Sequence, residues 1–321
     1  MKKYQIAGAD GPCVDFAVAV PTFPEPNGTM RMTGASWQGG GKVATGMVAS
    51  ARLGAKCAIL GAVGDDNYGK FCIEDFKAHH VDVSHFEVQE GKTTSLSVVI
   101  SNKQSQERSI VYNPGTAQMP NLVEKYADVL EDCEYFFVSR LDDVVQAAAK
   151  HAKAAGAKIF IDADSHSEEL ESFLPEIDVF VGSEFVYGAM FGDDKNYEAN
   201  CAKVRARGPK IVVFTFGGDG CVGLCDEGYF TLPAFRVDVV DTVGAGDVFH
   251  GAFVAGLLQG WSVKDICRFA SAVSAIKITR QGGRAGIPDM KTVQHFLETG
   301  EIDYKEIDER VEFYGRSLQY V

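Results

Sequence analysis

The sequence predicts an α/β fold: a doubly wound, mostly parallel sheet with helices on both faces, beside a small β-sheet lid. From about residue 120 onward, short apolar runs alternate with amphipathic stretches of helical period. Strands that are apolar on both sides are typical of a parallel sheet covered by two layers of helices. The expected strands are 135–139, 158–163, 178–182 and 210–216, and the expected helices between them are 142–155, 184–192 and 196–207.

A second observation is that short β-type runs dominate the N-terminal third. The runs TTSLSVVIS (93–101) and RSIVYN (108–113) are joined by a polar segment, which is typical of a hairpin. No Pro-rich linker or internal repeat divides the chain. We therefore expect a single domain over residues 1–321, with the lid formed by about 13–36 and 93–113. Further strands are expected at 4–9, 14–20 and 56–64, and helices at 42–54 and 65–80.

Composition and charge limit the classes of partner. The 321 residues carry a formal net charge of −13, which disfavours nucleic acid and anionic membranes as partners. No segment is apolar for long enough to span a bilayer, and Asp10 interrupts the N-terminal apolar run before it could form a signal peptide. A cytoplasmic protein is expected. The eight cysteines form no Cys-x-x-Cys pair, so buried reduced thiols are expected rather than disulfides or zinc ligands.

One glycine motif is misleading. Residues 218–223 match G-x-G-x-x-G after an apolar run, as in a dinucleotide-binding fold. That motif must open a helix, whereas the next residues contain Gly228 and Pro233 and indicate a hairpin. This mismatch argues against a dinucleotide-dependent dehydrogenase, and the absence of G-x-x-x-x-G-K-[ST] excludes a P-loop enzyme.

The segment DTVGAGDVFHGAF (241–253) carries the chemistry. Its glycines are followed at once by an apolar helix, so backbone N–H groups at a helix N-terminus are available to an anion. Asp247 lies in the first turn of that helix, beside the expected anion site. An aspartate there is also common as a simple helix cap, so Asp247 alone does not decide between the two roles.

The whole string resembles the C-terminal signature of the PfkB-type, ribokinase-like carbohydrate kinases. The resemblance implies a sugar kinase that uses ATP and Mg²⁺, with Asp247 as the base that accepts the proton of the attacking hydroxyl. It also implies that the backbone amides of Gly244, Ala245 and Gly246 stabilise charge on the transferred γ-phosphoryl group.

Other segments extend the resemblance over nearly the whole chain. GGGK (39–42) looks like the N-terminal signature of the family, TFGGDG (215–220) is similar to its nucleotide loop, and TRQGGRAGIP (279–288) is similar to the segment beside the adenine. The resemblance implies sugar binding by Asp15, Gly40, Gly41 and Lys42, and nucleotide binding by Ser183, Thr215, Gly217, Gly220 and Gly246. It further implies a K⁺ loop, mostly of carbonyl ligands, at Asp241, Val243, Lys277, Arg280 and Gly282, while the need for K⁺ stays open.

The chain departs from the family pattern at two places. Thr45 stands where the family usually has Asn, and Ser183 opens the sequence SEFV where the family has N-x-x-E, which supports magnesium. Glu184 is the residue expected to substitute in that support, with Asp162 and Asp164 near it in sequence.

Within the family, PAFRVDVVDTVGAGDVFHGAF and TRQGGRAGIPD are most similar to the sulfofructose kinase branch, which phosphorylates a ketose carrying a 6-sulfonate. A sulfonate requires cationic or amide donors. Asn113 and Arg140 are the first candidates, with Lys42 and Arg31 behind them. A lysine expected of that branch is replaced near Thr29, so a sugar 6-phosphate or a neutral ketose stays open as the substrate.

Two other functions stay open at this point. The missing N-x-x-E motif is also compatible with a non-catalytic protein that binds sugar or nucleotide, and the family includes nucleoside kinases. Lid strands with exposed faces pair between subunits in this family, so the resemblance also implies a homodimer through the lid.

Overall fold

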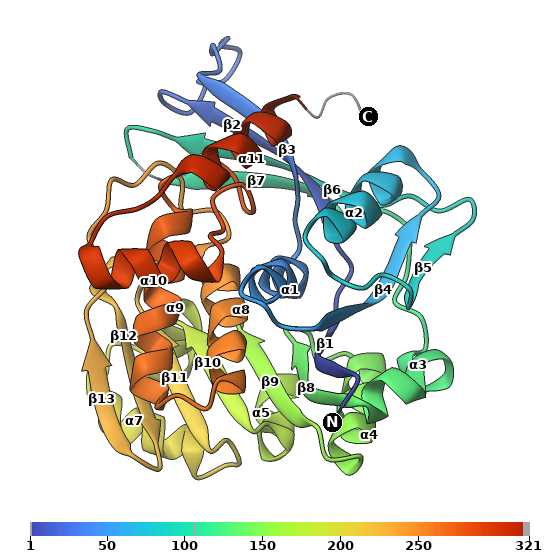
Figure 1. Ribbon diagram of the computed structural model, residues 1–321, viewed down its shortest axis with the longest axis vertical. Helices are drawn as coiled ribbons and strands as arrows, with labels where there is room; N and C mark the ends of the chain where they lie inside the picture. Colours follow the sequence, from blue (N-terminus) through green and yellow to red (C-terminus); the bar gives the residue numbers. More distant parts are fainter. Residues whose placement is uncertain (1, 106, 317–321) are drawn as a thin grey trace.

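In the computed structural model, which describes residues 2–105 and 107–316, two sheets share one chain (Figure 1). The large sheet is parallel except for its last two strands, and its order is β13-β12-β11-β10-β9-β8-β1-β4-β5. In chain order, these strands are β1 (Tyr4–Ala9), β4 (Cys57–Gly64), β5 (Phe86–Gln89), β8 (Cys133–Val138), β9 (Lys158–Ala163), β10 (Val179–Ser183), β11 (Ile211–Thr215), β12 (Cys221–Cys225) and β13 (Gly228–Leu232).

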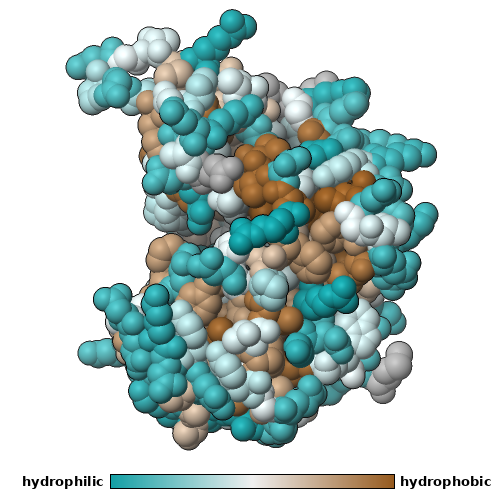
Figure 2. All heavy atoms as spheres, turned by 90° about the vertical axis from the view of Figure 1, so that its left-hand side faces the viewer, coloured by the Kyte–Doolittle hydropathy of each residue, from teal (hydrophilic) through white to brown (hydrophobic). Residues whose placement is uncertain are grey.

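The small sheet has the order β3-β2-β6-β7. Its strands are β2 (Cys13–Val20), β3 (Gly34–Gly39), β6 (Ser95–Asn102) and β7 (Arg108–Asn113). Strands β6 and β7 pair antiparallel, which confirms the predicted hairpin. The part of the molecule that contains this sheet stands above the larger body, and the outline is indented between the two (Figure 2).

Helices cover both faces of the large sheet, as the apolar strands predict. Alternate residues of each strand enter different cores: Val179 and Val181 of β10 join one cluster, and Phe180 joins the other. The first cluster is covered by α1 (Lys42–Arg52), α8 (Ala245–Leu258), α9 (Val263–Lys277) and α10 (Met290–Thr299). The second is covered by α3 (Leu122–Glu131), α4 (Asp143–Ala154), α5 (Glu168–Phe173), α6 (Glu184–Phe191) and α7 (Tyr197–Arg205).

Two further helices, α2 (Asn67–Ala78) and α11 (Lys305–Arg316), contact the small sheet. The misleading glycine motif leads through the short 3₁₀ helix η2 (Gly217–Asp219) into the β12–β13 hairpin and not into a helix, as expected. A second 3₁₀ helix, η1, spans Leu174–Glu176. All eight cysteines are buried and free. Within the described ranges, no helix has the length and apolarity needed to cross a membrane.

Helices α1 and α8 approach each other closely because both carry glycine where they cross. A Cβ added at Gly251 would lie 2.1 Å from the carbonyl oxygen of Gly46, which is far inside van der Waals contact. This crossing fixes the position of α8 over the sheet, and with it the position of the helix N-terminus.

We predict that Gly251→Ala lowers the free energy of unfolding by about 1–3 kcal/mol, the usual cost of overpacking a core. The control is Gly188→Ala in α6, where a Cβ would meet no atom within 4 Å. That change should be neutral or stabilising by roughly 0.5–1 kcal/mol, because alanine is the better helix former. Urea unfolding measures both; equal stability of the Gly251 variant and the wild type would contradict the close crossing.

Candidate active site

Several polar residues lie at the carboxyl ends of parallel strands, the usual place for a ligand in a doubly wound sheet. Asp10 follows β1, Arg140 follows β8, Asp164 follows β9, Ser183 ends β10 and Thr215 ends β11. The strand order therefore gathers at one edge side chains from Asp10 to Thr215, which are far apart in sequence.

The turn before α8 faces this edge. Gly244 is the N-cap of the helix and is left-handed, with φ of 73°, and a Cβ there would lie 3.1 Å from Gly283. Gly246 is exposed, and a Cβ on it would meet no atom within 4 Å. The N–H of Ala245 donates to the carbonyl oxygen of Thr242 at 3.2 Å. Because the first N–H groups of a helix have no partner within it, the other donors of this turn, with the positive dipole end, are available to an anion.

Asp247 lies among other carboxyl groups. Burial raises its pKa well above the ordinary value, and the charges of Asp162, Asp164 and Asp10 act in the same direction, while Lys42 opposes them. A carboxyl group in such surroundings binds a proton readily, which suits a general base.

Lys42, expected to bind sugar, forms an ion pair with Asp164. Although burial alone would raise the pKa of Asp164, the Lys42 ammonium and the Ser183 hydroxyl bring it below the ordinary value. Lys42 therefore neutralises part of the carboxylate cluster around Asp247.

The N-terminal signature places backbone next to two aspartates. Gly40 lies against Asp15, since a Cβ on Gly40 would be 2.4 Å from the carboxyl oxygen. Gly41 has φ of 95° and is the N-cap of α1, and the carboxylate of Asp10 accepts hydrogen bonds from the N–H groups of Ala44 and Gly11, both at 2.8 Å. Burial raises the pKa of both aspartates. Asp10 thus fixes the start of α1, and its charge also reaches Asp247.

Arg140 and Asn113, the two residues expected to bind an anionic group of the substrate, lie on different elements of the fold. Arg140 is well exposed and donates to Asp142 at 3.0 Å. It follows the carboxyl end of β8, and its charge opposes the rise that burial causes in the pKa of Asp10. Asn113 is exposed at the end of β7, where its side-chain oxygen accepts from the N–H of Gly115 at 3.0 Å. No contact between Arg140 and Asn113 is formed within the described ranges.

A cavity of about 400 Å³ joins the expected nucleotide loop to the turn before α8. Thr215, Gly217 and Gly220 line one end, and Ala245 and Gly246 line the other. The volume and the mainly apolar lining are ordinary for a small-molecule site. Sequence reasoning missed Arg236, the exposed cation of this cavity, and Ser274, whose hydroxyl donates to the carbonyl of Ala245 at 2.9 Å. An arginine between two aromatic or apolar residues, FRV, is the signal that could have found the first.

The residues present fit Mg²⁺ held mainly by phosphate oxygens and water. Asp162 is almost fully buried, and one of its carboxylate oxygens has no hydrogen-bond partner, although the other lies 3.4 Å from Nε2 of His250. Among the described residues there is no cluster of three or more metal-binding side chains. Mg²⁺ commonly uses one or two carboxylates plus substrate phosphates, so such a cluster is not required. Glu184 is exposed at the first residue of α6.

The residues of the expected K⁺ loop do not fit a bound monovalent cation. Lys277 is fully buried, and its ammonium group donates hydrogen bonds to the backbone carbonyls of Asp241 and Val243. Burial lowers the pKa of Lys277 to about 8, and the charges of Asp241 and Asp247 oppose that shift. Arg280 donates to Asp308 at 2.6 Å, and Gly282 has φ of 84°.

The comparisons agree with this geometry. Residues 11–290 match the pfkB family of carbohydrate kinases. The chain is 27% identical to the ribokinase of Haemophilus influenzae (88% of this chain and 95% of that protein covered) and 26% identical to the 5-dehydro-2-deoxygluconokinase of Clostridium perfringens (84% and 86%). The fold is that of a putative ribokinase II from E. coli solved with ATP and Mg²⁺, at a TM-score of 0.80 and 22% identity, covering 92% and 99% of the two chains.

The family match and these relatives place the chain among the phosphotransferases that use an alcohol group as acceptor. The chain belongs to the PfkB family and is an ATP-dependent sugar kinase of the ribokinase-like fold.

We predict that Lys42→Met moves the acid limb of the pH profile of kcat/KM to higher pH. The Lys42 ammonium lowers the pKa of Asp247, so its removal raises that pKa further and leaves the base protonated up to a higher pH. Lys264→Met, at an exposed position of α9, is the control and should leave the limb in place. An acid limb that stays fixed, or moves to lower pH, in the Lys42 variant would contradict the electrostatic coupling.

Proposed function

We propose that this kinase transfers the γ-phosphoryl group of ATP to a hydroxyl of a small anionic ketose, with Asp247 as the base. The observation that carries the proposal is the cavity that ends at Ala245 and Gly246, because these residues precede Asp247 directly. A nucleotide in this cavity would direct its phosphates to the N-terminus of α8, where donors are available.

The proposed step needs little covalent chemistry from the protein. The Asp247 carboxylate accepts the proton of the sugar hydroxyl while its oxygen bonds to the γ-phosphorus, and the bond from that phosphorus to the bridging oxygen breaks to release ADP. The amides of Gly244, Ala245 and Gly246 stabilise the charge on the transferred group. Asp15, beside Gly40, would bind hydroxyl groups on the side of the sugar that faces away from Asp247.

ATP and Mg²⁺ are the proposed cofactors. The related E. coli structure contains both, and the unpartnered oxygen of Asp162 together with Asp164 offers a place for the metal, directly or through water. When bound, Mg²⁺ neutralises charge on the phosphates. Ser183 and Glu184 would support the carboxylates from the start of α6.

The proposed substrate class rests on Arg140. Its charge acts on Asp10, one of the carboxyl groups around Asp247. Its exposed guanidinium can also bind a second anionic partner besides Asp142. A guanidinium binds sulfonate and phosphate oxygens well, so both sulfofructose and a ketose 6-phosphate fit this chemistry. Asn113 would add an amide from the lid strand β7.

We also propose that the small sheet acts as a lid and pairs with a second copy of the chain, in the cytoplasm. Strand β7 is an edge strand, and Ile110, Val111 and Tyr112 on it are all more than half exposed. An edge strand with exposed apolar side chains is a place where two chains pair. Light scattering that gives the mass of one chain at micromolar concentration would reject the dimer.

The catalytic role of Asp247 is tested by Asp247→Asn, which keeps the size of the side chain and removes the base. Loss of a general base costs about 10²- to 10⁴-fold in turnover, and ATP binding should be retained. ADP release is measured over sulfofructose, fructose 6-phosphate, tagatose 6-phosphate, fructose, ribose and adenosine. Near-normal turnover by the variant would contradict the mechanism.

The same panel tests the substrate class. If the best substrate is anionic, Arg140→Gln should raise its KM about 10- to 100-fold, because a hydrogen bond to a charged group contributes about 1.5–3 kcal/mol. Arg316→Gln is the matched control, since Arg316 is also exposed and paired, with Glu312 at 2.9 Å. A neutral sugar as best substrate would reject the anionic class, adenosine would indicate a nucleoside kinase, and binding without ADP release would indicate a non-catalytic protein.

A further inference from the structure

Lys277 holds a positive charge at a place where the mechanism does not use one. It ends α9, is fully buried, and has no carboxylate within ion-pair distance among residues 2–105 and 107–316. Its Nζ donates to the carbonyl oxygen of Asp241 at 3.2 Å and to the carbonyl oxygen of Val243. Because an isolated buried charge is costly, an ammonium that persists here must be compensated by these dipoles and by the nearby charges of Asp241 and Asp247.

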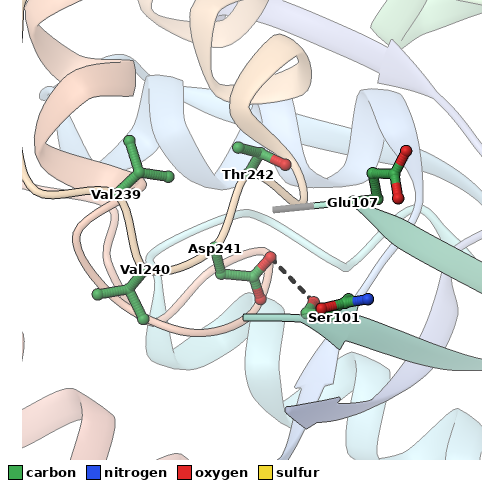
Figure 3. Close-up of a pocket in the computed structure, with 7 residues that line it drawn as sticks. Ser101, Glu107, Val239, Val240, Asp241 and Thr242 are labelled. Carbon is green, nitrogen blue, oxygen red and sulfur yellow. Dashed lines mark hydrogen bonds between the residues drawn. The ribbon is translucent and has the colours of Figure 1, made fainter. Parts of the chain in front are cut away.

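The carboxylate of Asp241 is occupied by neutral donors. One oxygen accepts from the Ser101 hydroxyl at 3.1 Å and from the N–H of Val243 at 3.0 Å, and the other accepts from the N–H of Gly282 at 2.8 Å. Figure 3 shows this carboxylate pointing toward Ser101, at the end of strand β6. Side-chain and backbone oxygens of Asp241 are thus all engaged by groups of the chain itself.

A K⁺ ion and this ammonium compete for the same oxygens. K⁺ requires several carbonyl or carboxylate oxygens that point to one centre, and an ammonium is a compact cation of similar size that uses the same acceptors. Two of the carbonyls expected to bind K⁺ already accept from Nζ, and a second cation beside it would be repelled at close range in a dry interior. The side chain of Lys277 therefore takes the position that a free cation would need.

We propose that the Lys277 ammonium is a tethered cation that holds the turn from Asp241 to Val243, so that this kinase works without K⁺. The turn leads directly into Gly244, Gly246 and Asp247, so its position sets the position of the anion-binding amides. Lys277 is thus a positioning residue, which acts on the reaction through the backbone. The inference rests on the proposed function of Asp247 and of the turn before α8.

The wild-type protein tests the inference first. Turnover is compared in potassium chloride and in choline chloride at equal ionic strength, with K⁺-free nucleotide. The two rates should agree, whereas an activating ion with an ordinary coupling energy would change activity about 5- to 150-fold. The thermal midpoint, measured without substrates, should likewise be the same in both salts. Activation of the wild type by K⁺ specifically would overturn the inference.

Two substitutions separate a tethered cation from a merely structural lysine. Lys277→Ala opens the site, so activity should fall in choline chloride and recover with K⁺ or ammonium, and K⁺ should raise the thermal midpoint by roughly 3 °C or more. Lys277→Met fills the space without charge, so its activity should fall and not recover. Lys264→Ala, on the exposed side of α9, is the control and should respond to neither ion.

The outcomes keep this inference separate from the proposed function. Full activity of Lys277→Ala in choline chloride, or equal recovery of the Ala and Met variants, would overturn the tethered cation. If Lys277→Ala does not fold, the salt comparison on the wild type decides alone. If the wild type turns over no substrate, the proposed function fails, and the effect of K⁺ on the thermal midpoints still decides whether Lys277 replaces the ion.

Discussion

The loop of residues 279–288 is held by hydrogen bonds to segments that lie far from it in sequence, and the site depends on these bonds. The Arg284 guanidinium donates to the carbonyl oxygen of Gly40 at 2.8 Å and forms an ion pair with Asp75. Gln38, fully buried in β3, accepts from the N–H groups of Arg284 and Ala285 at 2.8 and 2.9 Å. The glycine loop before α1 is tied to this segment through Gly40, and the turn before α8 is tied to it through the Gly282 N–H, which donates to Asp241.

The energetic importance of this arrangement follows from burial. Arg284 and Asp75 are both almost fully buried, and removing one partner of such a pair typically costs about 3–5 kcal/mol because it leaves the other charge unpaired. The same loop also reaches the carboxylate of Asp241 through the N–H of Gly282. One loop thus contacts both the glycine loop before α1, through Arg284, and the turn before α8, through Gly282.

Charge is distributed unevenly over the site, in keeping with phosphoryl transfer. Asp10, Asp162 and Asp164 all raise the pKa of Asp247, and the Lys42 ammonium opposes them. On the far side of the turn before α8, Lys277 faces backbone carbonyls. A cation tethered by its own side chain cannot dissociate, so the anion-binding turn is organised at any ionic composition. Burying the Lys277 ammonium is unfavourable, and the surrounding backbone dipoles and carboxylates offset this cost.

The sequence by itself determined the fold class, the paired small-sheet strands β6 and β7, and the family, because these depend on local patterns: apolar runs, glycine turns and the string DTVGAGDVFHGAF. It also singled out Asp247 and the loop that opens at Thr215 as candidates for the site, since their neighbours in sequence carry the signal. Only the tertiary structure decided that Lys42 pairs with Asp164, that Asp10 lies close enough to act on Asp247, and that the Lys277 side chain, rather than its carbonyl, is turned to Asp241 and Val243. The partners of a side chain come from distant segments that strand order and helix packing bring together, so the residues next to it in sequence do not indicate which partners it has.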